Sequence, residues 1–234
     1  MNQRLEEIRD SERKSHTEIY TDKELYQEGS WLSKPIKTVM ELMPLFQDYR
    51  TLQVLDLGCG VGRNCIAIAQ RYQDIPCVID CVDILELAID KLHANAEKFG
   101  VSACIQGVVC PIEKYPVREN HYDLILAISA LEHIDSRESF AGKLREINVG
   151  IRRGGIVCLV INSQIRETDK STGTDMPVLF EVNLSTEELQ ELLRRTFAGW
   201  TVLKSTVQSQ QYDTPREQGM RELHTNVVTF VAKK

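Results

Sequence analysis

The sequence contains no long run of apolar residues. Its longest apolar stretches, such as residues 157–161, are only a handful of residues long, whereas a helix that crosses a bilayer needs about 20. Residues 1–7 are mostly polar or charged and are not followed by the apolar segment of a secretory signal. We therefore expect a cytoplasmic protein that has no membrane partner.

Positive charge is also scarce. The 234 residues include 28 Lys and Arg against 34 Asp and Glu, which gives a net charge of −6, and no local basic stripe is evident. Because an acidic surface repels phosphate backbones, we do not expect a nucleic-acid partner. A hydrophobic content of 42% with 13 Gly and 7 Pro excludes collagen-like and disordered chains and is typical of a globular protein.

The cysteines and histidines lack the spacing of a metal site. The seven cysteines lie in the middle of the chain, mostly in apolar runs, and Cys77 and Cys81 have no second pair at a distance that suits tetrahedral zinc. Four of the five histidines show no useful spacing to one another: His16, His93, His121 and His224. We expect buried, reduced thiols and no metal.

From about residue 52, short β-branched segments alternate with longer amphipathic ones, a pattern typical of parallel strands joined by helices. Two later segments, 201–208 and 226–232, alternate polar and apolar residues and predict an antiparallel pair. The predicted fold class is α/β, a single Rossmann-like, doubly wound and mostly parallel sheet with a C-terminal antiparallel strand pair. The predicted parallel strands are 52–57, 77–83, 103–109, 122–129 and 155–162.

Helix boundaries are marked by local signals. Gly100 predicts the end of the helix that contains residues 85–99, and Ser185 with Glu188 forms a capping-box pattern at the start of another. Residues 1–30 are charged and weakly periodic, and we expect an N-terminal arm or lid there. Because no linker divides the remainder, residues 31–234 are predicted to form one domain.

A glycine-rich turn follows the first predicted strand. Gly58, Gly60 and Gly62 allow a sharp turn and let a ligand approach the backbone closely. A dinucleotide-binding fingerprint would need a further glycine at the position of Arg63, so the pattern favours a different nucleotide ligand.

Two carboxylates accompany this turn. Asp56 lies two residues before Gly58, where it would repel a pyrophosphate and attract a cation. Asp83 ends the next predicted strand, and a carboxylate at that position can accept hydrogen bonds from both hydroxyls of a ribose. Together they indicate a nucleoside that carries positive charge, and S-adenosylmethionine fits this description.

Residues 50–162 resemble the class I S-adenosylmethionine-dependent methyltransferases. The resemblance implies that Gly58, Gly60 and Gly62 form the cofactor turn, that Asp56 lies near the cofactor amino group, and that Asp83 holds the ribose. It also implies that Ile84 packs on the adenine. Members often place an Asp after the third strand, where this chain has Cys110 and Pro111, so Glu113 or a main-chain carbonyl would take the adenine amine. Two further residues are assigned to the cofactor by position: Ser129, after the fourth strand, and Trp31, before the first helix of the domain.

Within this superfamily, residues 60–64 and short segments near 180–189, 199–200 and 228–233 resemble the tellurite-resistance methyltransferases, which act on small soft anions. That family carries a His-Arg pair before its final strand. Here the corresponding stretch ends in Pro215 and Arg216 and is followed by Arg221. The resemblance implies a small-molecule methyl acceptor, with a soft anion as one form of it.

Three residues are candidates for the acceptor side. His133 follows the fourth strand, at the edge where open α/β sheets bind ligands, and is placed to act as a general base. A Glu-His pair at a helix start also has an ordinary structural explanation. Arg216 and Arg221 are placed to receive an anionic acceptor, or else are solvated surface residues.

The same residues leave other functions open. A protein methyltransferase of the same fold would need a peptide groove built by insertions, and a nicotinamide-dependent oxidoreductase would use the glycine-rich turn for a dinucleotide. A catalytically silent cofactor-binding subunit is a further alternative. The sequence leaves the identity of the acceptor and the oligomeric state undetermined.

Overall fold

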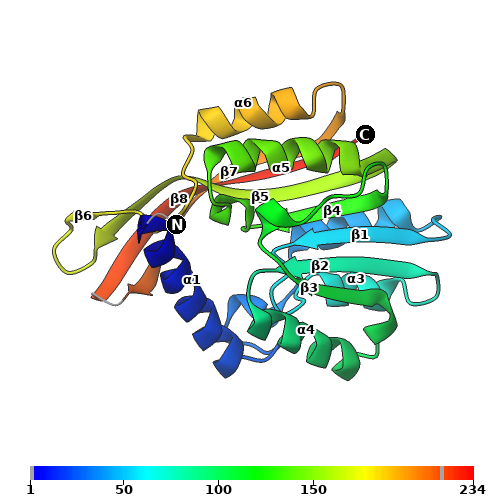
Figure 1. The fold of residues 1–234 in the computed structure, drawn as a ribbon, viewed down its shortest axis with the longest axis horizontal. Coiled ribbons are helices and arrows are strands. Elements are labelled where there is room, and N and C mark those ends of the chain that lie inside the picture. Colours follow the sequence, from blue (N-terminus) through cyan, green and yellow to red (C-terminus); the bar gives the residue numbers. More distant parts are fainter. Residues whose placement is uncertain (1–2, 217–218) are drawn as a thin grey trace.

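A mixed sheet runs through the computed structural model, which describes residues 3–216 and 219–234. Its strands lie in the order β3-β2-β1-β4-β5-β8-β7, and the short β6 pairs with β5 (Figure 1). The bounds are β1 Leu52–Leu57, β2 Cys77–Asp83, β3 Ile105–Val109, β4 Tyr122–Ile128, β5 Ile151–Asp169, β6 Asp175–Met176, β7 Thr201–Arg216 and β8 Gly219–Lys233.

Strands β1 to β5 are parallel to one another, whereas β8 is antiparallel to both β5 and β7. This arrangement confirms the predicted fold class. Strands β1 and β2 have the predicted bounds, and β3 and β4 differ from theirs by one or two residues. The β5, β7 and β8 strands continue well beyond the predicted segments.

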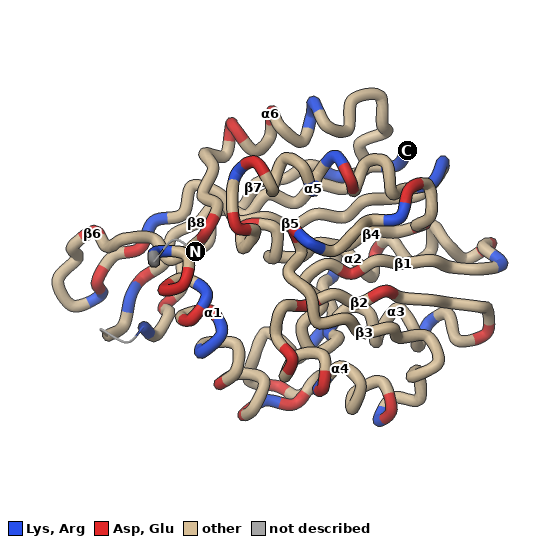
Figure 2. The backbone as a smooth tube through the Cα atoms, viewed as in Figure 1, with Lys and Arg blue, Asp and Glu red and all other residues tan. Residues whose placement is uncertain are grey.

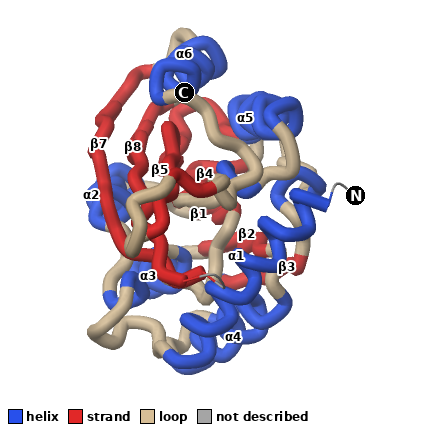
Figure 3. The backbone as a smooth tube through the Cα atoms, turned by 90° about the vertical axis from the view of Figure 1, so that its left-hand side faces the viewer, coloured by secondary structure: helices blue, strands red, loops and turns tan. Residues whose placement is uncertain are grey.

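Helices cover both faces of the sheet (Figure 3). One hydrophobic core contains buried residues of α2 Lys37–Leu42, α3 Cys65–Arg71 and α4 Glu86–Lys98, and the other contains those of α5 Arg137–Gly150 and α6 Thr186–Thr196. The predicted caps are present. Ser185 and Glu188 form a capping box at the start of α6, and Gly100 follows α4 with a φ of +70°.

The N-terminal segment forms a long helix, α1 Gln3–Asp22, which was not predicted because its sequence is only weakly periodic. This helix lies between α4 and the outer ends of β5 and β8 (Figure 1). Its residues Ile8 and Tyr20 are buried, but most of its side chains are charged or polar. Acidic and basic residues gather along α1 and at the nearby strand ends (Figure 2).

Short 3₁₀ helices occur in several connections between these elements. They are η1 Trp31–Ser33, η2 Met43–Phe46, η3 Ser102–Cys104, η4 Ile112–Lys114 and η5 Leu131–His133.

Strands β1 and β4 are neighbours although β2 and β3 lie between them in sequence, so the strand order reverses at β1. In open α/β sheets, ligands bind beyond the carboxyl ends of the strands at this reversal.

Candidate cofactor site and acceptor side

The glycine-rich turn lies at this reversal point. Backbone N–H groups of Gly58 and Cys59 donate to the carbonyl of Val82 at 2.8 and 3.0 Å, which ties the turn to the end of β2. Gly60 has a φ of +52°, in the left-handed region that favours glycine. A Cβ at Gly60 would lie 2.7 Å from the hydroxyl of Tyr20, so the space above this residue is bounded by α1.

The other two glycines of the turn are surrounded by protein atoms. A Cβ at Gly58 would collide with the side chain of Ala130, and one at Gly62 would lie 2.7–2.8 Å from Ile66 and Leu92. Close packing of the chain therefore explains both residues by itself. At Gly60 the atom nearest to an added Cβ is instead the hydroxyl of Tyr20, so this glycine is the one that faces α1.

Two carboxylates meet beneath this turn. Asp83 accepts hydrogen bonds from the backbone N–H of Gly60 at 2.9 Å and of Leu85 at 3.0 Å. Asp56 is 1% exposed, and its Oδ2 has no hydrogen-bond partner among the described residues. Burial and the charge of Asp83 raise the pKa of Asp56 to about 7.

A buried carboxylate without a partner is costly, and a bound cationic group would remove that cost. An α-ammonium meets this requirement, and a ribose would offer hydroxyl donors to Asp83. The residues present thus fit S-adenosylmethionine. They suit a pyrophosphate poorly, because both carboxylates would repel it.

The remaining residues assigned to the cofactor from the sequence differ in exposure and in hydrogen-bond partners. Ile84 is 43% exposed and directly follows Asp83. Ser129 is exposed, has a φ of +50° and donates its N–H to the carbonyl of Val160 at 2.7 Å. Glu113, in η4, pairs with Arg9 of α1 at 2.8 Å.

Trp31 belongs to an aromatic group that α1 completes. Its ring centroid lies 6.4 Å from that of His16 and 6.2 Å from that of Tyr20, and the guanidinium of Arg63 lies 5.3 Å from the Trp31 centroid. The N-terminal segment therefore contributes three rings next to the glycine-rich turn.

His133 ends η5 and lies in a polar cluster. Its Nδ1 is 3.1 Å from Oε2 of Glu181, its Nε2 is 3.9 Å from Oε2 of Glu12, and its ring stacks on Phe180 with centroids 5.0 Å apart. The preceding residue, Glu132, is fully buried and accepts a hydrogen bond from the N–H of Asn162 at 3.2 Å.

Arg216 and Arg221 meet at a shared carboxylate. They contact the two oxygens of buried Glu167 at 3.2 and 3.0 Å, and Arg216 also donates to Oγ of Ser11 at 3.1 Å. Arg216 lies 3.7 Å from Glu12, which places it beside the His133 cluster. Arg221 does not approach Glu12 in this way; its Nη1 also donates a hydrogen bond to the carbonyl of Pro177 at 3.1 Å.

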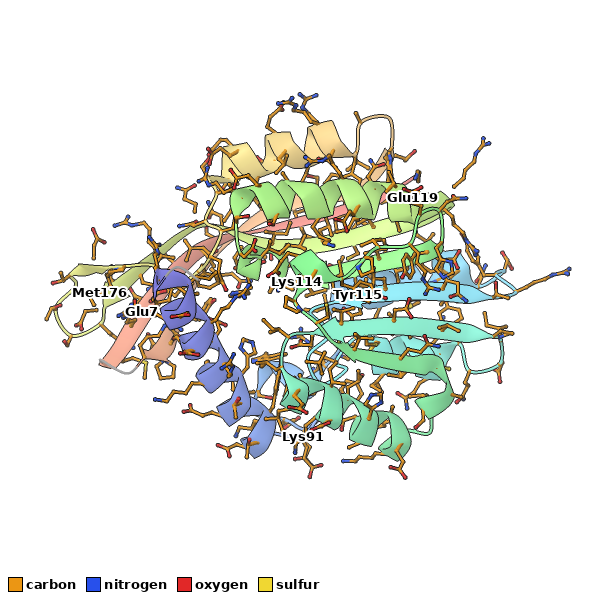
Figure 4. The ribbon with its side chains drawn as sticks, in the orientation of Figure 1. Glu7, Lys91, Lys114, Tyr115, Glu119 and Met176 are labelled. Carbon is orange, nitrogen blue, oxygen red and sulfur yellow. The ribbon has the colours of Figure 1, made fainter. Side chains whose placement is uncertain are left out.

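Several of these residues were not identified from the sequence, namely Arg9, Glu12, Tyr20, Glu167 and Glu181. Arg9, Glu12, His16 and Tyr20 follow a helical spacing of three to four residues along α1, which is the signal that would have placed them on one face. Figure 4 labels Glu7 on α1 and Lys114 and Tyr115 after β3, the two segments that the Arg9–Glu113 ion pair joins.

Other features of the described residues do not add a site. Within 3–216 and 219–234, no group of three or more His, Cys, Asp or Glu side chains is arranged so that it could hold a metal ion. No helix in that part of the chain has the length and apolar character to span a membrane. A cavity of about 440 Å³ between α6 and β7 is lined by residues such as Phe197, Trp200 and Phe230, none of which belongs to the turn or to the His133 cluster.

Comparison with known proteins finds similarity in the segment that contains the glycine-rich turn. Residues 54–155, which include the turn and both carboxylates, match the family described as a methyltransferase domain. Among curated relatives, the chain is 31% identical over 114 residues to the tRNA N(3)-cytidine methyltransferase METTL2B of Homo sapiens, a match that covers 47% of this chain and 29% of that protein. It is 27% identical over 118 residues to ajmaline N-methyltransferase of Rauvolfia serpentina, covering 50% of this chain and 38% of that one.

The chain thus spans about a third of the length of these two relatives. Among solved structures, TehB from Haemophilus influenzae superposes with a TM-score of 0.64 at 20% identity, covering 85% of this chain and 62% of that one. This likeness supports the fold. The reversal of the sheet order, the glycine-rich turn and both carboxylates therefore lie in the segment, residues 54–155, that matches the methyltransferase-domain family.

Proposed function

We propose that this protein transfers a methyl group from S-adenosylmethionine to a small-molecule acceptor. The observation that carries the proposal is the buried carboxylate of Asp56, whose Oδ2 has no hydrogen-bond partner among the described residues, together with Asp83 at the glycine-rich turn. A nucleoside with a positively charged group satisfies both carboxylates, and few other common cofactors do.

S-Adenosylmethionine supplies a methyl group on a positively charged sulfur. The protein's own residues bind and orient it: Asp83 would accept from the ribose hydroxyls, Asp56 would face the ammonium, and Gly60 would leave room for the ligand. Residues assigned by resemblance, Ile84, Glu113, Ser129 and Trp31, would line the rest of the site. Holding an acceptor atom in line with the methyl carbon supplies much of the rate acceleration.

Helix α1 would close the site from above. Tyr20 is 4% exposed and its hydroxyl lies over Gly60, while Arg9 ties the helix to the connection after β3 through Glu113. We propose that residues 1–30 form this covering arm and that residues 31–234 form the methyltransferase domain. The arm would exclude water during transfer.

A small acceptor suits the charge of the molecule better than a nucleic acid. The net charge of −6 opposes binding of a polyanion. A peptide acceptor would need a groove, and a nicotinamide-dependent oxidoreductase would need to place a pyrophosphate next to Asp56 and Asp83. These alternatives are tested below by acceptor and by cofactor.

A soft anion is the narrower form of the proposal. Arg216 is the better of the two arginines for this role, because its Nε is buried and has no hydrogen-bond partner among the described residues, and because it lies beside Glu12 of the His133 cluster. Arg221 is bound to Glu167 and Pro177, so we propose that it supports Arg216 through their common carboxylate.

The test is a screen for S-adenosylhomocysteine release with thiols, chalcogen oxyanions, amines and peptides as acceptors. We expect turnover with at least one small acceptor and none with peptides. Asp83→Ala should remove the activity, whereas Asp90→Ala, an exposed change on α4, should not. Binding of S-adenosylmethionine without release on any small acceptor would contradict the proposed transferase function.

A further inference from the structure

His133 lies between two carboxylates that come from distant parts of the chain. Glu12 lies on α1, and Glu181 lies in the connection before α6. The Nδ1 of His133 is within hydrogen-bond distance of Glu181, at 3.1 Å, whereas Nε2 is 3.9 Å from Glu12. Phe180 stacks on the ring at an interplanar angle of 27°, which fixes the plane in which both nitrogens point.

The groups around this ring favour its charged form. Burial opposes a charge on His133, but the carboxylates outweigh it and raise the pKa of His133 to about 9. The reciprocal effect appears on Glu12, whose pKa is lowered to about 2 against the effect of burial, mainly by the charge of His133. The titratable and charged groups that face the ring from the elements packed around it are Glu12 and His16 of α1, Glu132 of η5 and Glu181 before α6; Arg9 and Arg216 approach these carboxylates.

We propose that Glu12 and Glu181 are positioning residues that act through His133, holding its ring as a charged hydrogen-bond donor that orients the methyl acceptor. This inference rests on the proposed methyltransferase function. Because Nδ1–H is engaged by Glu181, the Nε2–H, which is beyond hydrogen-bond distance of Glu12, is the donor left for a bound molecule.

The inference assigns His133 a role opposite to general-base catalysis. A ring that already carries its proton has no lone pair to accept another. The acceptors that suit this site are therefore those that arrive without a proton to lose, such as a thiolate or another soft nucleophile, and the ring would hold them through an atom other than the attacking one.

The first test reads the ring of His133 directly and needs no acceptor. Proton–nitrogen correlation spectra are recorded from pH 5 to 10, and the His133 signals are assigned by their absence in His133→Gln. We expect a titration midpoint near 9 in the wild type. Glu12→Gln and Glu181→Gln should each lower it by about one pH unit or more, because each removes a negative charge next to the ring.

Glu18→Gln is the matched control, since Glu18 is an exposed residue on the same helix and the chemical change is the same. It should leave the midpoint unchanged. A wild-type midpoint near 6.5, or a midpoint that neither Glu12→Gln nor Glu181→Gln alters, would overturn the inference. Using both variants keeps the test decisive if one of them fails to fold.

The second test is the pH dependence of kcat/KM with the acceptor found by the release screen. We expect activity to fall as pH rises through about 9, and the fall to begin at lower pH in Glu12→Gln. His133→Gln, which keeps an N–H donor, should retain more activity than His133→Ala. Activity that instead rises through the His133 midpoint would identify a general base and refute the proposed role.

These outcomes are separable from the proposed function. A protein that does not bind S-adenosylmethionine refutes the transferase proposal whatever the ring titration shows. A protein that binds the cofactor and transfers methyl groups, but whose His133 titrates as an ordinary histidine, refutes only the role assigned to Glu12 and Glu181.

Discussion

Asp56 is the residue whose environment most directly indicates that a cationic ligand binds here. Its side chain is buried near the end of β1, and its Oδ2 has no hydrogen-bond partner among the described residues. Burial and the charge of Asp83 raise its pKa to about 7. In the free protein it is therefore partly protonated at neutral pH. A bound ammonium would favour the charged form and drive this proton off.

This linkage gives a pH-dependent prediction for cofactor affinity. Because the free protein holds the Asp56 proton below about pH 7 and the complex does not, S-adenosylmethionine should bind more tightly as pH rises from 6 to 8. Calorimetric titration in buffers of different ionisation enthalpy should detect release of up to one proton per cofactor near pH 7. Asp56→Asn should bind more weakly and release none, and an unchanged proton count in this variant would remove Asp56 from the cofactor site.

At the scale of elements, the glycine-rich turn combines two physical requirements. It must adopt a left-handed conformation at Gly60, and that residue must carry no Cβ because the hydroxyl of Tyr20 on α1 approaches it closely. A substitution at Gly60 violates both requirements, whereas a glycine in open space violates only the first.

Gly60→Val and Gly173→Val separate these requirements. Both glycines have positive φ, +52° and +69°, but a Cβ at Gly173 would have no neighbour within 4 Å. Both variants should lose about 1–2 kcal/mol of the free energy of unfolding, measured by urea denaturation, from backbone strain. Gly60→Val should lose more than Gly173→Val, because its side chain would also collide with the Tyr20 hydroxyl. Only Gly60→Val should also lose S-adenosylmethionine binding. A folded Gly60→Val protein that binds the cofactor normally would show that the turn is not the cradle.

The elements also show what can be predicted from this sequence. Strands β1 and β2 have the expected bounds because both are continuous apolar runs that end in turn or cap residues. Helix α1 was not predicted, since its inner face carries Arg9, Glu12 and His16 and so lacks an apolar stripe. The bulge that lets β5 continue past Ser163 also has no simple sequence signal.

The residues of the candidate site also divide into those that a local sequence pattern predicts and those that it does not. Asp56, Gly60 and Asp83 could be predicted to lie together from a local pattern, because all three lie at the ends of two adjacent strands or in the turn between the first strand and its helix. Glu12 and Glu181 could not, since 121 and 48 residues separate them from His133, and only the packing of α1 and the connection before α6 brings them together.

At the scale of the whole molecule, the sheet and helix α1 have different roles: the sheet positions the candidate site residues, and α1 contacts both groups of them. The parallel strands bring Asp56 and Asp83 together at the reversal point, and the antiparallel β7 and β8 place Arg216 near the acceptor side. Helix α1 contacts both regions, through Tyr20 above Gly60 and through Glu12 beside His133. In the proposed function, cofactor binding and acceptor orientation would therefore be joined through one helix.

The central claim is that this architecture binds S-adenosylmethionine at Asp83, and equilibrium titration with S-adenosylmethionine and with NAD tests it most directly. We predict saturable binding of S-adenosylmethionine and none of NAD. Asp83→Ala should weaken binding about tenfold or more, because each charged hydrogen bond lost is worth roughly 1.5–3 kcal/mol, while Asp90→Ala should bind as the wild type does. Tighter binding of NAD, or an affinity for S-adenosylmethionine that Asp83→Ala leaves within a factor of about two, would contradict the account.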